Sequence, residues 1–112
     1  MTNIEYRKFK AHIFMYLDAD ELADILYGYL HKDENRTLWG GVEMMCKEGY
    51  FNKTYEQVLD TLKYIYGDKY DESKYLTENG EIRVKNGVAY CWTVYKAKIA
   101  KTIEIMIKKG DI

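Results

Sequence analysis

The sequence contains no proline in its 112 residues. Proline fixes its own backbone angle and interrupts helices and central strands, so a chain without it can form long uninterrupted helices. Twelve residues are tyrosine, whose large ring with a polar tip suits half-buried helix faces and recognition surfaces. A genome that favours lysine, tyrosine and isoleucine would give the same tyrosine content, and both explanations stay open. We expect a helix-rich fold.

Length and composition predict one domain spanning residues 1–112. Hydrophobic residues make up 47% of the chain, which is enough for a core without metal or disulfide support. Two cysteines are too few for a disulfide-stabilised secreted domain. The N-terminus shows no signal-peptide pattern, and the longest strongly apolar stretch, residues 11–17, is too short to cross a bilayer. We therefore expect a cytoplasmic protein that does not contact membranes.

Apolar residues at helical spacing predict five helices. The first is expected over about residues 3–17. Its second half is apolar on nearly all sides, so we expect it to be the central helix, with Ile13, Phe14 and Leu17 buried. Helix-capping patterns predict the starts of the next three helices at Asp18, Thr37 and Thr54. The fifth helix is expected from about Tyr90 to Lys109.

Two Asn-Gly pairs, at residues 79–80 and 86–87, predict tight turns before the last helix. We expect strands near residues 75–77 and 81–84, joined through the first turn. Residues 88–94 fit either a third strand or the start of the last helix, and we favour the helix. The expected fold is mainly α, with five helices and a small β-hairpin at about residues 75–84 before a long C-terminal helix. The alternative is an α+β fold with a three-stranded meander.

Charge is segregated along the chain, although the net charge is only −1. Residues 17–80 carry seven basic and 14 acidic residues, whereas residues 81–112 carry seven basic and three acidic ones. On a helical wheel, one face of the last helix gathers lysines around two apolar residues, and these form the expected partner-binding set: Val94, Lys98, Lys101, Ile105 and Lys108. Lys109 falls on the same face. An ordinary solvated face is the alternative, since lysines are favoured near a helix C-terminus.

The sequence shows no recognisable catalytic or metal-binding pattern. The potential metal ligands His12, His31, Cys46 and Cys91 are scattered singly, and His12 is expected to be a hydrogen-bonded histidine on a buried helix. The acidic cluster at residues 18–24 lacks the calcium-loop pattern, and acids in the first turn of a helix are explained by its dipole. Phosphate-loop and serine-nucleophile motifs are also missing. We expect no enzyme activity, no cofactor and no metal.

Two functions remain as hypotheses. The first is a protein-binding module whose partner has an acidic surface, with a homodimer as one possibility. Small proteins of phages and mobile elements that inhibit host systems, such as anti-CRISPR proteins, have a similar profile, by analogy only.

The second hypothesis is a DNA-binding regulator. The order of three helices and a hairpin over residues 18–90 resembles a winged helix, and Leu76-Thr77-Glu78-Asn79-Gly80 is similar to a wing-strand phrase in such regulators. The helix expected over residues 54–66 would read DNA, but its charged residues are mostly acidic. Acidic residues oppose the approach of phosphates, so nucleic acid is the less favoured partner.

Overall fold

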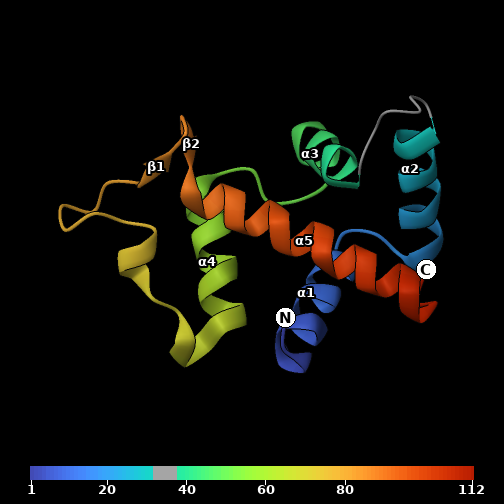
Figure 1. Ribbon diagram of the computed structural model, residues 1–112, viewed down its shortest axis with the longest axis horizontal. Helices are drawn as coiled ribbons and strands as arrows, with labels where there is room; N and C mark the ends of the chain where they lie inside the picture. The colour runs from blue at the N-terminus through green and yellow to red at the C-terminus, as the bar shows by residue number, and fades with distance from the viewer. Residues whose placement is uncertain (32–37) are drawn as a thin grey trace.

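The computed structural model describes residues 1–31 and 38–112. The expected cap Thr37 lies outside the described residues, as does the side chain of His31. Five α-helices, two short 3₁₀ turns and a small β-hairpin form within the described part of the chain (Figure 1). In chain order they are α1 (Asn3–Phe14), α2 (Ala19–His31), α3 (Leu38–Glu48), α4 (Tyr55–Tyr66), η1 (Gly67–Lys69), η2 (Glu72–Lys74), β1 (Val84–Lys85), β2 (Val88–Ala89) and α5 (Tyr90–Lys109). The expected mainly α fold with a long C-terminal helix is confirmed.

Local hydrogen bonds explain where the helices begin. Thr54 and Gln57 form a reciprocal capping box at the start of α4, with the Gln57 amide donating to Thr54 Oγ1 at 3.1 Å. The Asp18 side chain accepts a hydrogen bond from the Glu21 amide at 2.8 Å before α2. These two caps agree with the sequence prediction. A further capping box, made by Thr2 and Glu5, starts α1.

The central element is α5, not α1. Figure 1 shows α5 crossing the middle of the molecule, and it packs against α1, α3 and α4, while α2 packs on α3. The α5 side chains Tyr95, Ile99, Ile103 and Met106 are fully buried. The expectation of a central first helix was therefore wrong, because the longest helix gives the others a common surface to pack on.

Helix α1 also ends earlier than expected, at Phe14 rather than about residue 17. Ile13 and Leu17 are buried as expected, but Phe14 is 36% exposed. Phe14 lies about 100° around the helix from Ile13, so the two side chains cannot both face the same core. The apolar character on all sides of this segment reflects exposed apolar residues, including Met15 and Tyr16.

The hairpin lies later in the chain than expected. Strands β1 and β2 pair in antiparallel fashion around Asn86-Gly87, with Val84 opposite Ala89. Asn86 and Gly87 both have positive φ angles, 54° and 78°, as a two-residue hairpin turn of this type requires. Around the earlier Asn-Gly pair, a single antiparallel bridge joins Leu76 and Ile82. The segment at residues 75–84 is thus a looser extension of the hairpin.

Candidate partner-binding surface

The five expected partner-binding residues lie along one side of α5. Their spacing of three or four residues places them in a single row, here called the basic strip: Val94, Lys98, Lys101, Ile105 and Lys108. Lys101 and Lys108 are exposed, and the other three side chains are partly buried. Ile99 and Ile103 turn into the core on the opposite side, and Trp92 is partly buried. The helix therefore presents lysines outward while it anchors itself with aliphatic side chains.

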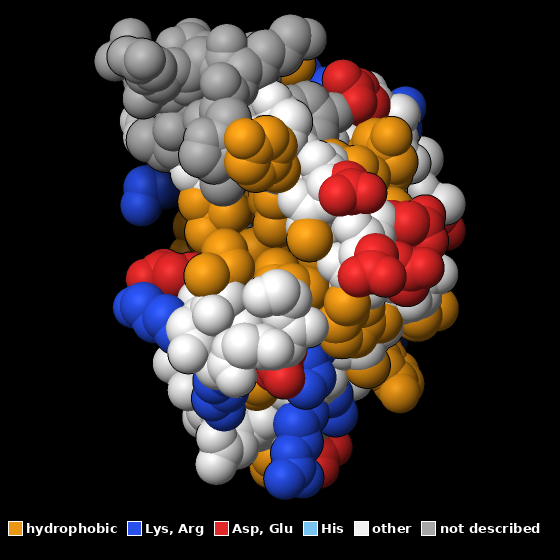
Figure 2. Space-filling model, turned by 90° about the vertical axis from the view of Figure 1, so that its right-hand side faces the viewer, with side chains coloured by type: hydrophobic (Ala, Val, Ile, Leu, Met, Phe, Trp, Pro, Cys, Tyr) orange, Lys and Arg blue, Asp and Glu red, His pale blue; other side chains and the backbone are white. Residues whose placement is uncertain are grey.

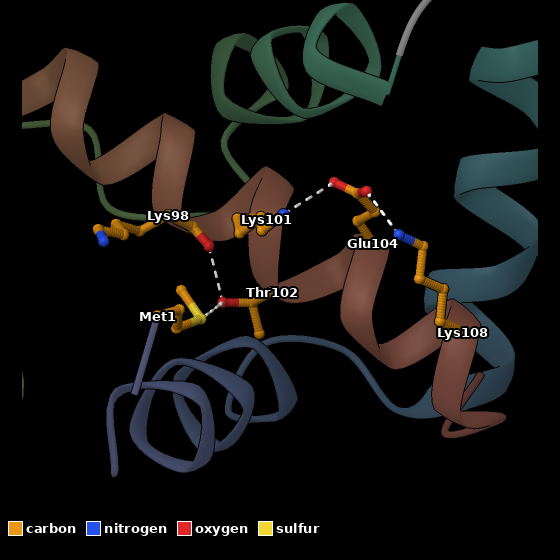
Figure 3. A network of polar contacts seen from close by, with 6 residues as sticks. All are labelled: Met1, Lys98, Lys101, Thr102, Glu104 and Lys108. Carbon is orange, nitrogen blue, oxygen red and sulfur yellow. Dashed lines mark hydrogen bonds and ion pairs between the residues drawn. The ribbon is translucent and has the colours of Figure 1, made fainter. Parts of the chain in front are cut away.

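The C-terminal half of the strip contains a carboxylate that the sequence analysis overlooked. Glu104 forms ion pairs with Lys108 at 3.1 Å and with Lys101 at 3.8 Å (Figure 3). The hydrogen bond from Lys108 and the charge of Lys101 lower the pKa of Glu104 below its ordinary value. The spacing of Glu104 four residues before Lys108 is the signal that would have indicated this pair. Two lysines around one carboxylate leave one positive charge in excess.

Lys98 takes a different direction from the lysines near Glu104. Figure 3 shows its side chain turned away from Lys101 and Glu104, while its backbone carbonyl accepts a hydrogen bond from Thr102 Oγ1 at 2.7 Å. Lys98 and Val94 instead line a hollow of about 390 Å³, here called the tyrosine hollow. Its other walls include four tyrosines and two further lysines: Tyr66, Tyr70, Tyr75, Tyr90, Lys69 and Lys74. The structure thus divides the strip between an ion-paired half and a half that opens onto this hollow.

The walls of the tyrosine hollow come from segments far apart in the sequence. Tyr66 ends α4, Tyr70 and Tyr75 flank η2, and Tyr90 begins α5. The rings of Tyr70 and Tyr75 stack with centroids 5.7 Å apart, and those of Tyr75 and Tyr90 stack at 5.9 Å. No sequence signal indicates that the rings of Tyr70, Tyr75 and Tyr90 stack on one another.

Lys96 is a structural lysine on the same helix. Its side chain is only 7% exposed and forms an ion pair with Glu43 of α3 at 3.2 Å. Its ammonium group also lies 5.6 Å from the ring centres of both Trp39 and Trp92. A cation held between two indole rings and a carboxylate ties α5 to α3, so Lys96 belongs to the core and not to the basic strip.

The buried histidine and cysteines are also held in structural environments. His12 lies 2.6 Å from the Tyr95 hydroxyl, which confirms the expectation of a hydrogen-bonded histidine on a buried helix. Burial lowers the pKa of His12 to about 4 and raises the pKa of Cys46 to about 11. The Cys46 thiol therefore stays protonated at neutral pH, which makes it a poor nucleophile. Among the side chains that the structure describes, which exclude those of residues 29–37, no three His, Cys, Asp or Glu residues converge as metal ligands.

Comparisons with known proteins give no family assignment. No family model matches the chain, and no curated protein or solved structure is significantly similar to it. Among the helices of the described residues, none combines the length and the apolar character needed to span a bilayer.

Proposed function

We propose that this protein is a non-enzymatic protein-binding module that docks an acidic partner surface on the basic strip of α5. One observation carries the proposal: the strip sets three lysines around two partly buried apolar side chains, and within the described residues Glu104 is the only carboxylate that forms an ion pair with them. An apolar centre with a charged rim is the usual anatomy of a recognition surface. Opposite charge on the partner would speed its approach and fix its orientation.

The partner can be another protein or a second copy of this chain. Figure 2 shows the end of the molecule where α2 and the C-terminal end of α5 lie, and there hydrophobic side chains separate a group of acidic side chains from basic ones. Acidic residues in the first turns of α2, including Asp20 and Glu21, are exposed. A second copy could therefore bring its own acidic α2 against the strip. By analogy with small phage and mobile-element proteins, the proposed role is inhibition of a host system in the cytoplasm.

The alternative function is DNA binding by a winged-helix-like regulator. The order of α2, α3, α4 and the hairpin fits that reading. In that reading α3 and α4 would form the helix-turn-helix, whose two helices pack on one another. In the described residues, α3 and α4 each pack mainly on α5 instead. Helix α4 also exposes two acidic side chains, Glu56 and Asp60, which would repel the phosphates of DNA. These features favour the protein-binding proposal.

Charge reversal on the strip tests the proposal. In the Lys98→Glu/Lys101→Glu double variant we expect capture of the partner from cell lysate to be lost, because the strip would repel an acidic surface. The melting temperature should hardly change, since exposed charges contribute little to folding. Lys53→Glu is the matched control: Lys53 is exposed and forms no ion pair within the described residues.

The measurement is affinity capture followed by mass spectrometry, with the solution mass of the purified chain recorded to detect self-association. Partner capture that survives the double reversal would place the interface elsewhere. A sequence-dependent shift of duplex DNA at physiological salt would instead support the regulator.

A further inference from the structure

The tyrosine hollow contains phenol groups that the rest of the protein leaves unused. None of the hydroxyls of Tyr66, Tyr70, Tyr75 and Tyr90 has a hydrogen-bond partner among the described residues. Tyr75 is the decisive case, because the residue is only 5% exposed and its hydroxyl has no partner among the described residues. A buried donor without an acceptor is costly and uncommon in folded proteins.

The other two buried tyrosines of the described residues have hydrogen-bond partners. The Tyr6 hydroxyl donates to Asp111 Oδ2 at 2.6 Å, and the Tyr95 hydroxyl pairs with His12 at 2.6 Å. The stacked rings of Tyr70, Tyr75 and Tyr90 are held nearly parallel, within 23° and 24° of one another. The hydroxyls at the hollow are therefore carried on fixed rings, in a protein that elsewhere pairs its buried phenols.

The lysines that line the hollow also lack ion-pair partners. Lys69, Lys74 and Lys98 form no ion pair within residues 1–31 and 38–112, whereas Lys96, Lys101 and Lys108 each pair with a glutamate. The lysines of the hollow therefore lack the glutamate partners that Lys96, Lys101 and Lys108 have on α5.

The two carboxylates that line the hollow are already engaged. Glu5 accepts a hydrogen bond from the Thr2 amide at 2.9 Å. Asp71 accepts from the amide and the hydroxyl of Ser73, and these bonds, with a smaller contribution from the charge of Lys74, lower its pKa. Three lysines and two carboxylates thus line the hollow, which leaves one positive charge in excess, and none of these lysines forms an ion pair within the described residues.

Phenol donors beside free ammonium groups are suited to an oxyanion. A phosphate monoester carries close to two negative charges at neutral pH and three strong acceptor oxygens, which match three lysines better than a single carboxylate does. A volume of about 390 Å³ accommodates the phosphate together with part of the group that bears it. We propose that the tyrosine hollow is a binding site for a phosphate monoester. This inference goes beyond the proposed protein-binding function and does not depend on it.

Inorganic phosphate is the first probe. In an NMR titration of the full chain at constant ionic strength, we expect saturable shifts of the amides of residues 69–75, 90 and 98. The Tyr75→Phe variant should bind about 10-fold more weakly, because one donor to a charged acceptor is lost. Its melting temperature should not fall, since the ring stack is kept and the hydroxyl has no protein partner. Tyr64→Phe is the control, because Tyr64 is 76% exposed and lies away from the hollow.

A second pair of variants tests the lysines. Lys74→Gln/Lys98→Gln should abolish saturable binding, while Lys101→Gln should retain it because Lys101 does not line the hollow. Sodium chloride at matched ionic strength must leave the same amides unshifted. If chloride gives the same shifts, or if both Tyr75→Phe and Lys74→Gln/Lys98→Gln bind phosphate as well as the wild type, the proposal is overturned.

Two phosphate monoesters then identify the source of the ligand. Glycerol 3-phosphate represents a small metabolite, and a short phosphoserine peptide represents a modified protein. Displacement of inorganic phosphate by either compound supports the site, and the tighter of the two indicates where the phosphate comes from. If neither compound displaces inorganic phosphate, the hollow does not recognise monoesters and the proposal fails.

Discussion

At the scale of single residues, burial separates neighbours that look alike in the sequence. Ile13 is fully buried, whereas the adjacent Phe14 is 36% exposed. Both are large and apolar, and the segment's apolar character on nearly all sides gave them the same expected role. The direction in which each side chain leaves α1 decides the difference.

Replacing Ile13 by Ala should therefore lower the free energy of unfolding by roughly 2–5 kcal/mol, the range for emptying a packed site. Phe14→Ala is the matched comparison and should cost less than Ile13→Ala, about 1–2 kcal/mol, because Phe14 is 36% exposed and its removal leaves no closed cavity. Urea denaturation of both variants measures the difference. Equal costs would show that Ile13 and Phe14 share one environment and would contradict this description of α1.

His12 predicts a pH dependence of stability. Burial lowers its pKa from 6.5 to about 4 in the folded protein, so between these values the unfolded chain binds more protons than the folded one. The contribution of His12 is complete above pH 6.5 and is lost progressively as the pH falls toward 4, by up to about 3 kcal/mol.

This loss is measured from denaturation midpoints at pH 7, 5.5 and 4 in the wild type and in His12→Gln, since the carboxyl groups titrate in both. The difference between the two proteins should shrink as the pH falls. A difference that is constant over this range would mean that His12 is accessible to protons in the folded state.

At the scale of elements, the helix boundaries with a capping pattern were the most predictable feature. Thr54 with Gln57 marks the start of α4, and Gly110 follows the end of α5. Helix α5 begins at Tyr90 as expected, although no side chain caps it. The position of the hairpin was less predictable, because both Asn-Gly pairs form turns and neither pattern shows how far pairing extends from each turn. In the structure, strand pairing beyond a single bridge occurs only around the second pair over the described residues.

The capping box of α4 gives a prediction at this scale. Thr54→Ala should lower the free energy of unfolding by about 1 kcal/mol, because the Gln57 amide loses its acceptor. Thr54→Ser keeps the hydroxyl oxygen at the same place and should lower the free energy of unfolding by only a few tenths of a kcal/mol. Thermal or urea denaturation measures both variants, and equal stabilities of Thr54→Ala and the wild type would show that the cap contributes nothing.

At the scale of the whole molecule, long-range packing placed the features that the sequence could not. The central position of α5 depends on which faces of α1, α3 and α4 meet it, and no local pattern encodes that arrangement. The tyrosine hollow likewise joins the end of α4, the 3₁₀ turns and the start of α5. The basic strip, in contrast, follows from helical spacing within one element, so its five residues could be aligned from the sequence alone.

The central claim is that a partner docks on this strip, and site-specific photo-crosslinking tests it most directly. A benzophenone amino acid is placed at position 101, whose side chain is 54% exposed on the strip, and in a second protein at position 64, which is 76% exposed on α4. We predict a cross-link from position 101 to an acidic segment of the partner, or of a second copy, and none from position 64. Cross-links from position 64 alone would contradict the claim and move the interface to α4.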